Sequence, residues 1–163
     1  MKIIFLHLQI LLFSINVIFS QPTAPKLSEP FKDGEKLEYR VHYGIFNASY
    51  ASLSLSKKDS LDDENLLASG YGKTIGLARL FFKVEDYYSS YFNTNKVDPI
   101  IFKRNIYEGG YTKNLEVSFD SQGNKASVNN IKKGTLEVIP TEENVQDLIS
   151  SLYYLRKNFS EES

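Results

Sequence analysis

The amino-acid sequence predicts a mainly β domain, a curved antiparallel sheet or partial barrel of about seven or eight strands with one C-terminal helix packed on it. Apolar residues alternate with polar residues along most of the chain, which is the pattern of strands that bury one face. Clusters of glycine, asparagine and aspartate separate these segments. One apolar stripe at helical spacing follows Pro140 near the end of the chain.

Composition excludes several classes of function. The chain has 163 residues, of which 42% are hydrophobic, and this is enough for one domain. Lys and Arg number 19 and Asp and Glu number 20, giving a net charge of -1, so no basic field attracts nucleic acid. The absence of cysteine excludes disulfides, thiolate zinc sites and a thiol nucleophile.

The first residues predict export. Lys2 precedes an apolar run from Ile3 to Phe19, so residues 1–20 resemble a signal peptide. The alternative is a membrane anchor, but polar residues interrupt the run and make it marginal for spanning a bilayer. We expect cleavage after Ser20, which leaves no transmembrane anchor.

A proline-rich linker is expected at residues 21–30, because each proline lacks an amide donor and favours an extended predecessor. The remainder, residues 31–163, is then expected to form a single β-rich domain.

The first strands are the clearest. From Leu37 to Tyr43 apolar and charged residues alternate, Gly44 breaks the pattern, and a second alternation at 47–56 completes a hairpin. Residues 57–65 are charged and turn-like, and a shorter strand with glycines follows at 66–73.

The middle of the chain interrupts the alternation once. Residues 75–83 have apolar spacings of three, one and three, which predict a short helix or wide turn. Five further strands are expected after it, the last two weaker: 84–92, 100–108, 111–119, 125–130 and 135–139.

The C-terminal helix is expected from Thr141, a plausible N-cap, to Lys157. The residues at helical spacing form its apolar stripe: Val145, Leu148, Ile149, Leu152 and Leu155. Leu148, Ile149 and Leu152 should then be buried against inward strand residues, Leu37 and Val41 among them.

No motif in the sequence points to catalysis, and we expect no enzyme, cofactor or metal site. Gly72-Lys73-Thr74 lacks the earlier glycine of a phosphate-binding loop, so these glycines are expected to lie on a curved strand. His42 would be the only histidine left after signal cleavage, and its charged neighbours predict a surface position. The acids from Asp59 to Glu64 lack calcium-loop spacing and predict a solvated loop.

Tyrosines are the remaining candidates for ligand contact. Neighbouring side chains on a strand point to opposite faces, so Tyr87 and Tyr88 cannot both be in the core. One member of each adjacent pair could line a rim or groove, although tyrosine also suits half-buried strands generally. The candidate contact residues are Tyr87, Tyr88, Tyr91, Tyr107, Tyr111, Tyr153 and Tyr154.

The chain contains several short motifs in a characteristic order: Phe31–Tyr39, Tyr43-Gly44, Gly72–Gly76, Val84–Tyr91, Pro99–Arg104, Glu108–Tyr111 and Asp147–Arg156. In these motifs and their order the chain resembles the bacterial exported proteins grouped as domain-of-unknown-function 3108. The resemblance implies a protein of the bacterial periplasm or cell envelope, built largely of antiparallel strands, and it supplies no activity. It also implies further strands after the helix, so the domain is expected to be truncated at its C-terminus or unusually short.

Two functions remain open. The first is non-catalytic binding of an apolar ligand or a protein segment in the curved sheet. The alternative is an envelope assembly or scaffolding factor that binds a protein partner through its sheet edge.

Overall fold

The computed structural model describes residues 30–57 and 64–161. The expected signal peptide, nearly all of the expected linker and most of the acidic loop lie outside these residues. The strands are β1 (Lys36–Tyr43), β2 (Phe46–Lys57), β3 (Asn65–Thr74), β4 (Val84–Asn93), β5 (Pro99–Glu108), β6 (Tyr111–Asp120), β7 (Lys125–Asn130) and β8 (Thr135–Pro140). The helices are α2 (Gly76–Phe81) and α3 (Ser150–Glu161).

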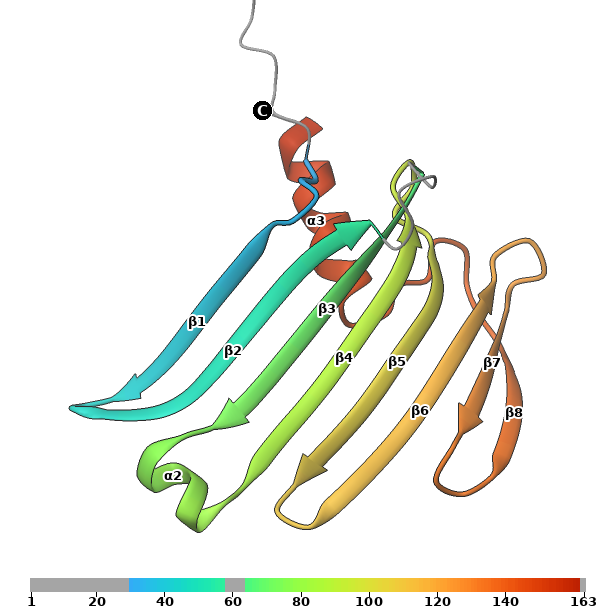
Figure 1. The fold of residues 1–163 in the computed structure, drawn as a ribbon. Helices are drawn as coiled ribbons and strands as arrows, with labels where there is room; N and C mark the ends of the chain where they lie inside the picture. The colour runs from blue at the N-terminus through green and yellow to red at the C-terminus, as the bar shows by residue number, and fades with distance from the viewer. Residues whose placement is uncertain (1–29, 58–63, 162–163) are drawn as a thin grey trace, which may run out of the picture.

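The strands form one open, eight-stranded antiparallel sheet in which the spatial order equals the chain order (Figure 1). Each strand pairs with the next, and β1 and β8 are the two edges. The predicted mainly β fold is confirmed, with strand boundaries almost as expected and with α2 in place of the interrupted alternation.

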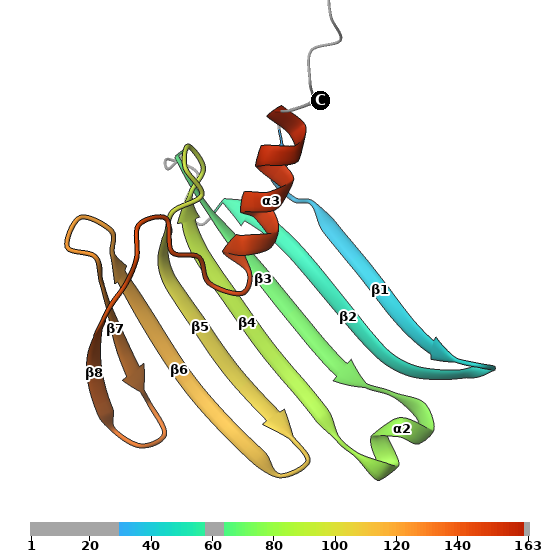
Figure 2. The ribbon, with the colours of Figure 1, turned by 180° about the vertical axis from the view of Figure 1, so that it is seen from behind.

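The two faces of the sheet differ because α3 lies on only one of them (Figure 2). Ala68 of β3 pairs with Ser90 of β4 on the side of α3, which we call the helix face. Ser69 and Ser89 form the next pair and lie on the opposite face. The strands also have two ends: α3 covers the core end, where β2 ends and β3 begins, and α2 lies at the tip end.

The hydrophobic core lies at the core end. Its fully or almost fully buried members come from three strands, the β4–β5 connection, the residue before α3 and α3 itself: Leu55, Leu66, Ala68, Phe92, Val97, Ile149 and Tyr153. The ring centres of Phe92 and Tyr153 are 5.4 Å apart, and the ring of Phe31 contacts both edge-on. Gly70 lets the chain before α3 approach closely, since a Cβ there would lie 3.0 Å from Cδ1 of Ile149.

The helix begins later than the sequence suggested. Residues 141–149 are not helical; they lead from the sheet edge at β8 to the helix face. Asp147 caps the helix, since its Oδ1 accepts hydrogen bonds from the amides of Ile149 (2.8 Å) and Ser150 (2.9 Å). The Ser150 hydroxyl accepts one in return from the Asp147 amide at 2.9 Å. This reciprocal cap, rather than Thr141, fixes the helix start.

The buried face of α3 also differs from the expectation. Ile149 and Tyr153 pack on the sheet, while Leu148 is 58% and Leu152 50% exposed. Burial of Ile149 is confirmed, but that of Leu148 and Leu152 is wrong because the cap turns Ile149 and Tyr153 toward the sheet. Leu37 and Val41 share the helix face but are exposed, because both lie on the edge strand β1 and Val41 also lies toward the tip end, away from α3.

Candidate ligand-binding site

A groove of about 410 Å³ lies on the helix face between the sheet and the segment that leads to α3. Its lining comes from β4 to β8 and from that segment: Tyr88, Phe102, Arg104, Val117, Phe119, Ala126, Ile139, Thr141, Val145, Asp147 and Leu148. The volume lies in the range of small-molecule sites, and most of these side chains are apolar.

The apolar floor follows from strand register. Phe102 of β5 pairs with Val117 of β6, and Phe119 pairs with Ala126 of β7, so their side chains share the helix face. Ile139 extends the row onto β8 through its pairing with Ala126. Because α3 contacts the sheet only at the core end, this floor faces the groove.

Arg104 places a positive charge on this apolar floor. It pairs with Tyr88 on one side and Leu115 on the other, and its guanidinium lies 5.9 Å from the centre of the Tyr88 ring. Its Nε is buried without a hydrogen-bond partner, and no carboxylate of a described residue forms an ion pair with Arg104. A buried donor without an acceptor is unfavourable. An anionic group bound in the groove could accept hydrogen bonds from the Arg104 guanidinium and balance its charge.

Asp147 does not fill that role. Besides the two helix amides, its carboxylate accepts a 2.6 Å hydrogen bond from the Ser90 hydroxyl through Oδ2. These donors hold the carboxylate at the start of α3, so Asp147 forms one end of the groove and does not pair with Arg104.

Titratable groups around Arg104 respond to burial. Burial raises the pKa of Asp86, although a 3.2 Å hydrogen bond from the Tyr107 amide opposes the change. The nearby carboxylate of Glu108 raises this pKa further, while Arg104 lowers it. Burial likewise raises the pKa of Tyr88, and the charge of Asp86 adds to that rise.

The opposite face carries a second, more polar groove of about 320 Å³. Most of its lining residues have side chains with a hydroxyl, amide or amine group: Ser52, Ser54, Ser69, Tyr71, Tyr87, Ser89, Lys103 and Asn105. Gly70 and Tyr88 complete the lining. The rings of Tyr71 and Tyr87 stack on each other with centres 4.6 Å apart. Their stacked faces therefore already have partners within the protein.

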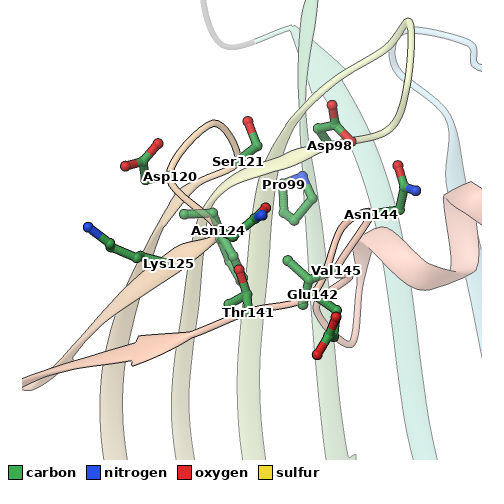
Figure 3. A pocket seen from close by; sticks show the side chains of 11 residues that line it. Asp98, Pro99, Asp120, Ser121, Asn124, Lys125, Thr141, Glu142, Asn144 and Val145 are labelled. Carbon is green, nitrogen blue, oxygen red and sulfur yellow. The ribbon is translucent and has the colours of Figure 1, made fainter.

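A third hollow, at the core end between β6, β7 and residues 141–145, is too small for a ligand (Figure 3). Its volume of about 20 Å³ corresponds to little more than a water molecule. Asp98, Asp120 and Glu142 border it but point away from one another. In the described part of the chain, no cluster of acids and histidines could hold a metal ion.

The structure separates the seven candidate tyrosines. Tyr87 and Tyr88 point to opposite faces, as adjacent strand residues must, and each borders a groove. Tyr153 is buried in the core, and Tyr154 packs partly against that core.

The other three line neither large groove. Tyr91 is half-buried on β4, and Tyr111 is exposed at the tip end of β6. The Lys83 ammonium lies over the ring of Tyr107, with Nζ 4.9 Å from the ring centre. Ligand contact by these seven residues remains a prediction.

Arg104 was not among the residues predicted to contact a ligand. The sequence does indicate which face of β5 it lies on, because Arg104 is two residues after Phe102 and two before Ile106 and shares their face. His42 is exposed on β1, as expected. Gly70 and Gly72 lie on β3, also as expected of glycines outside a phosphate loop.

Together these features define a mainly β protein: an eight-stranded open antiparallel sheet with a C-terminal helix and a short helix. The chain belongs to the family described as protein of unknown function DUF3108, whose model matches residues 38–162. This match confirms the resemblance seen in the sequence motifs. No curated protein and no solved structure matches the chain significantly.

Proposed function

We propose that the protein is an exported, non-catalytic binding protein that holds an amphiphile in the helix-face groove. The apolar chain of the ligand would lie along Phe102, Val117 and Phe119, and its anionic end would meet Arg104. The single observation that carries this proposal is the buried, unpartnered Nε of Arg104 in an apolar groove of ligand size. Guanidinium groups pair bidentately with carboxylates and phosphates, which suits such an end group.

Export to the bacterial periplasm or cell envelope is part of the proposal. It is supported by Lys2 and the apolar run of residues 3–19. Among the residues from 30 to 161 that the structure describes, no helix is sufficiently long and apolar to cross a bilayer.

The non-catalytic assignment is supported by the composition of the groove. Its lining holds no histidine and no cysteine, and its one carboxylate, Asp147, is occupied as a helix cap. Acid–base or nucleophilic catalysis needs a positioned group that is able to exchange a proton or attack a substrate.

Calorimetric titration with dodecanoate and with dodecanol tests the proposal. Dodecanoate should bind more tightly than the neutral alcohol, and Arg104→Met should weaken only dodecanoate binding, by about tenfold or more. Leu148→Glu adds a negative charge to the groove wall and should also weaken dodecanoate binding. Leu152→Glu is the matched control, because Leu152 is similarly exposed near the start of α3 but does not line the groove. Absence of binding by both compounds would overturn the proposal.

A second candidate, an envelope assembly or scaffolding factor, is favoured by one observation. All six residues of β8 are exposed, and within the described residues β8 pairs only with β7, so a partner strand could add to this edge. Native mass spectrometry of protein purified from the envelope separates the candidates: a bound amphiphile supports the first. A stoichiometric protein that is lost on Val138→Pro supports the second.

A further inference from the structure

Large apolar side chains are exposed together at the tip end of the sheet. Ile45 is 90%, Leu80 80% and Phe81 86% exposed, and Phe46, Leu77 and Phe82 are also exposed. They come from the β1–β2 turn, from the first residue of β2, from α2 and from the residue after α2. Isolated apolar residues are common on protein surfaces, but a contiguous group of this size marks an interaction surface.

Backbone contacts place these residues side by side. The amide of Ile75 donates a 3.0 Å hydrogen bond to the carbonyl of Ala48, which joins the start of α2 to β2. At Gly76 a Cβ would lie 3.0 Å from the carbonyl oxygen of Asn47, so α2 passes close to the residue after Phe46. Figures 1 and 2 both show α2 and the β1–β2 turn at the end away from α3.

The exposed position of α2 is held by specific bonds. The Thr74 hydroxyl donates to the carbonyl of Phe82 at 3.0 Å and accepts from the amide of Val84 at 2.9 Å, which closes the loop around α2. Arg79 donates to Glu85 at 2.8 Å. The apolar side chains of α2 are therefore held outward by a fixed backbone.

The charge around this tip is positive. Residues 40–47 and 73–83 contain Arg40, Lys73, Arg79 and Lys83 and no carboxylate. Glu85 and Glu108 lie just outside these segments: Glu85 pairs with Arg79 and lies 3.8 Å from Lys83, and Glu108 is the register partner of Val84. Four cations against these two carboxylates leave an excess of positive charge. Apolar side chains flanked by Lys and Arg are typical of surfaces that enter the headgroup region of anionic membranes.

We propose that this tip inserts shallowly into an anionic lipid surface. The apolar group protrudes from the end of the sheet, whereas both large grooves lie on its faces. A protruding apolar end suits a fluid phase, which needs no complementary shape. None of these apolar residues lines the helix-face groove, so insertion of the tip does not depend on amphiphile binding.

Co-sedimentation with vesicles tests the proposal. The full chain, with its N-terminus determined by intact mass, is mixed with vesicles of equal parts phosphatidylcholine and phosphatidylglycerol. The unchanged protein should bind, and the double variant Leu80→Ser/Phe81→Ser should bind about tenfold more weakly or worse. The matched control is Leu136→Ser/Val138→Ser, which removes two exposed apolar residues from the other edge of the sheet and should bind normally.

Equal vesicle binding by the unchanged protein and both double variants, or binding by none of them, would overturn the proposal. A spectroscopic probe covers the case of a poorly folded double variant. The chain has no tryptophan, so Phe81→Trp introduces a single one whose emission should shift to the blue when vesicles are added. Leu136→Trp should show no such shift, and an unshifted Phe81→Trp spectrum contradicts insertion. The tip variants should bind dodecanoate in solution like the unchanged protein, which separates this test from that of the groove.

Discussion

The hydroxyl of Ser90 donates a 2.6 Å hydrogen bond to Oδ2 of Asp147, joining the middle of the sheet to the residue that caps α3. Both residues are buried. Since Oδ1 of the same carboxylate caps the helix, one side chain ties the start of α3 to β4. The position of the helix, and with it one end of the helix-face groove, depends on this contact.

Ser90→Ala should therefore destabilise the protein by about 1–3 kcal/mol, because it leaves the buried Oδ2 of Asp147 without its donor. Ser89→Ala is the control, because it also removes a serine hydroxyl, but from the adjacent residue on the opposite face of the sheet. It should change the free energy of unfolding by less than about 0.5 kcal/mol. Denaturant unfolding measures both. Equal effects of the two variants would contradict the proposed role of Ser90.

Tyr153→Ala should destabilise the protein by about 3 kcal/mol or more, because it removes a buried aromatic ring that contacts Phe92 and Phe31. Leu152→Ala, at the next position on α3, should have a much smaller effect because half of Leu152 is already exposed. Thermal unfolding of the two variants provides the comparison, and a larger loss from Leu152→Ala would mean that α3 docks by its other face.

Burial of Tyr153 also has a spectroscopic consequence. Burial raises the pKa of its hydroxyl to about 12. In a spectrophotometric titration of the folded protein, Tyr153→Phe should remove absorbance change only from the most alkaline part of the curve. A loss near the ordinary tyrosine pKa, about 10, would show that this hydroxyl is not buried in solution.

Asp86→Asn should change how stability depends on pH. Because burial raises the pKa of Asp86, the folded state binds its proton more readily than the unfolded state. The unchanged protein should therefore lose stability as the pH rises from the ordinary Asp range through the raised pKa. Asp86→Asn removes this loss, so at neutral pH it should be the more stable protein, and the advantage should disappear at acidic pH. The measurement is urea unfolding across that pH range, and a constant difference would contradict the assignment.

The ion pair between Glu35 and Arg156 should give the opposite pH dependence. The hydrogen bonds from Arg156 lower the pKa of Glu35. Stability from this pair should be present above the ordinary Glu pKa and lost as the pH falls through the lowered value. Because Arg156 is partly exposed, Arg156→Met should cost about 1 kcal/mol or less at neutral pH. A double-mutant cycle with Glu35→Gln measures the coupling, which should vanish at low pH.

The strands could be predicted from the sequence because each buries one face and is bounded by turn residues, as in the hairpin around Gly44. The start of α3 could not, because two sites compete for it. Thr141 follows Pro140 and looks like a cap, but Asp147 and Ser150 cap each other and bond to the sheet. Shifting the helix start also changes which residues of the apolar stripe reach the sheet.

The candidate site was less predictable for a related reason. Apolar periodicity shows which residues share a face, but it cannot show which part of that face a helix will cover. The sequence could therefore predict that Arg104 lies on the helix face, but it could not predict that Arg104 lines a groove. In the same way, the spacing of residues 75–83 predicted a short helix or wide turn, and the structure has α2 there. The exposure of Leu80 and Phe81 could not be predicted from that spacing.

The order of the sheet has a consequence for the time course of folding. Every strand pairs with its neighbour in the chain, so hairpins can add one after another with short loops to close. The contacts of α3 are different, since Ser90 and Asp147 are 57 residues apart in sequence and Glu35 and Arg156 are 121 apart. We expect α3 to dock after the transition state, so Ser90→Ala should accelerate unfolding and leave the refolding rate nearly unchanged in stopped-flow experiments. Slower refolding of Ser90→Ala would instead place the helix in the folding nucleus.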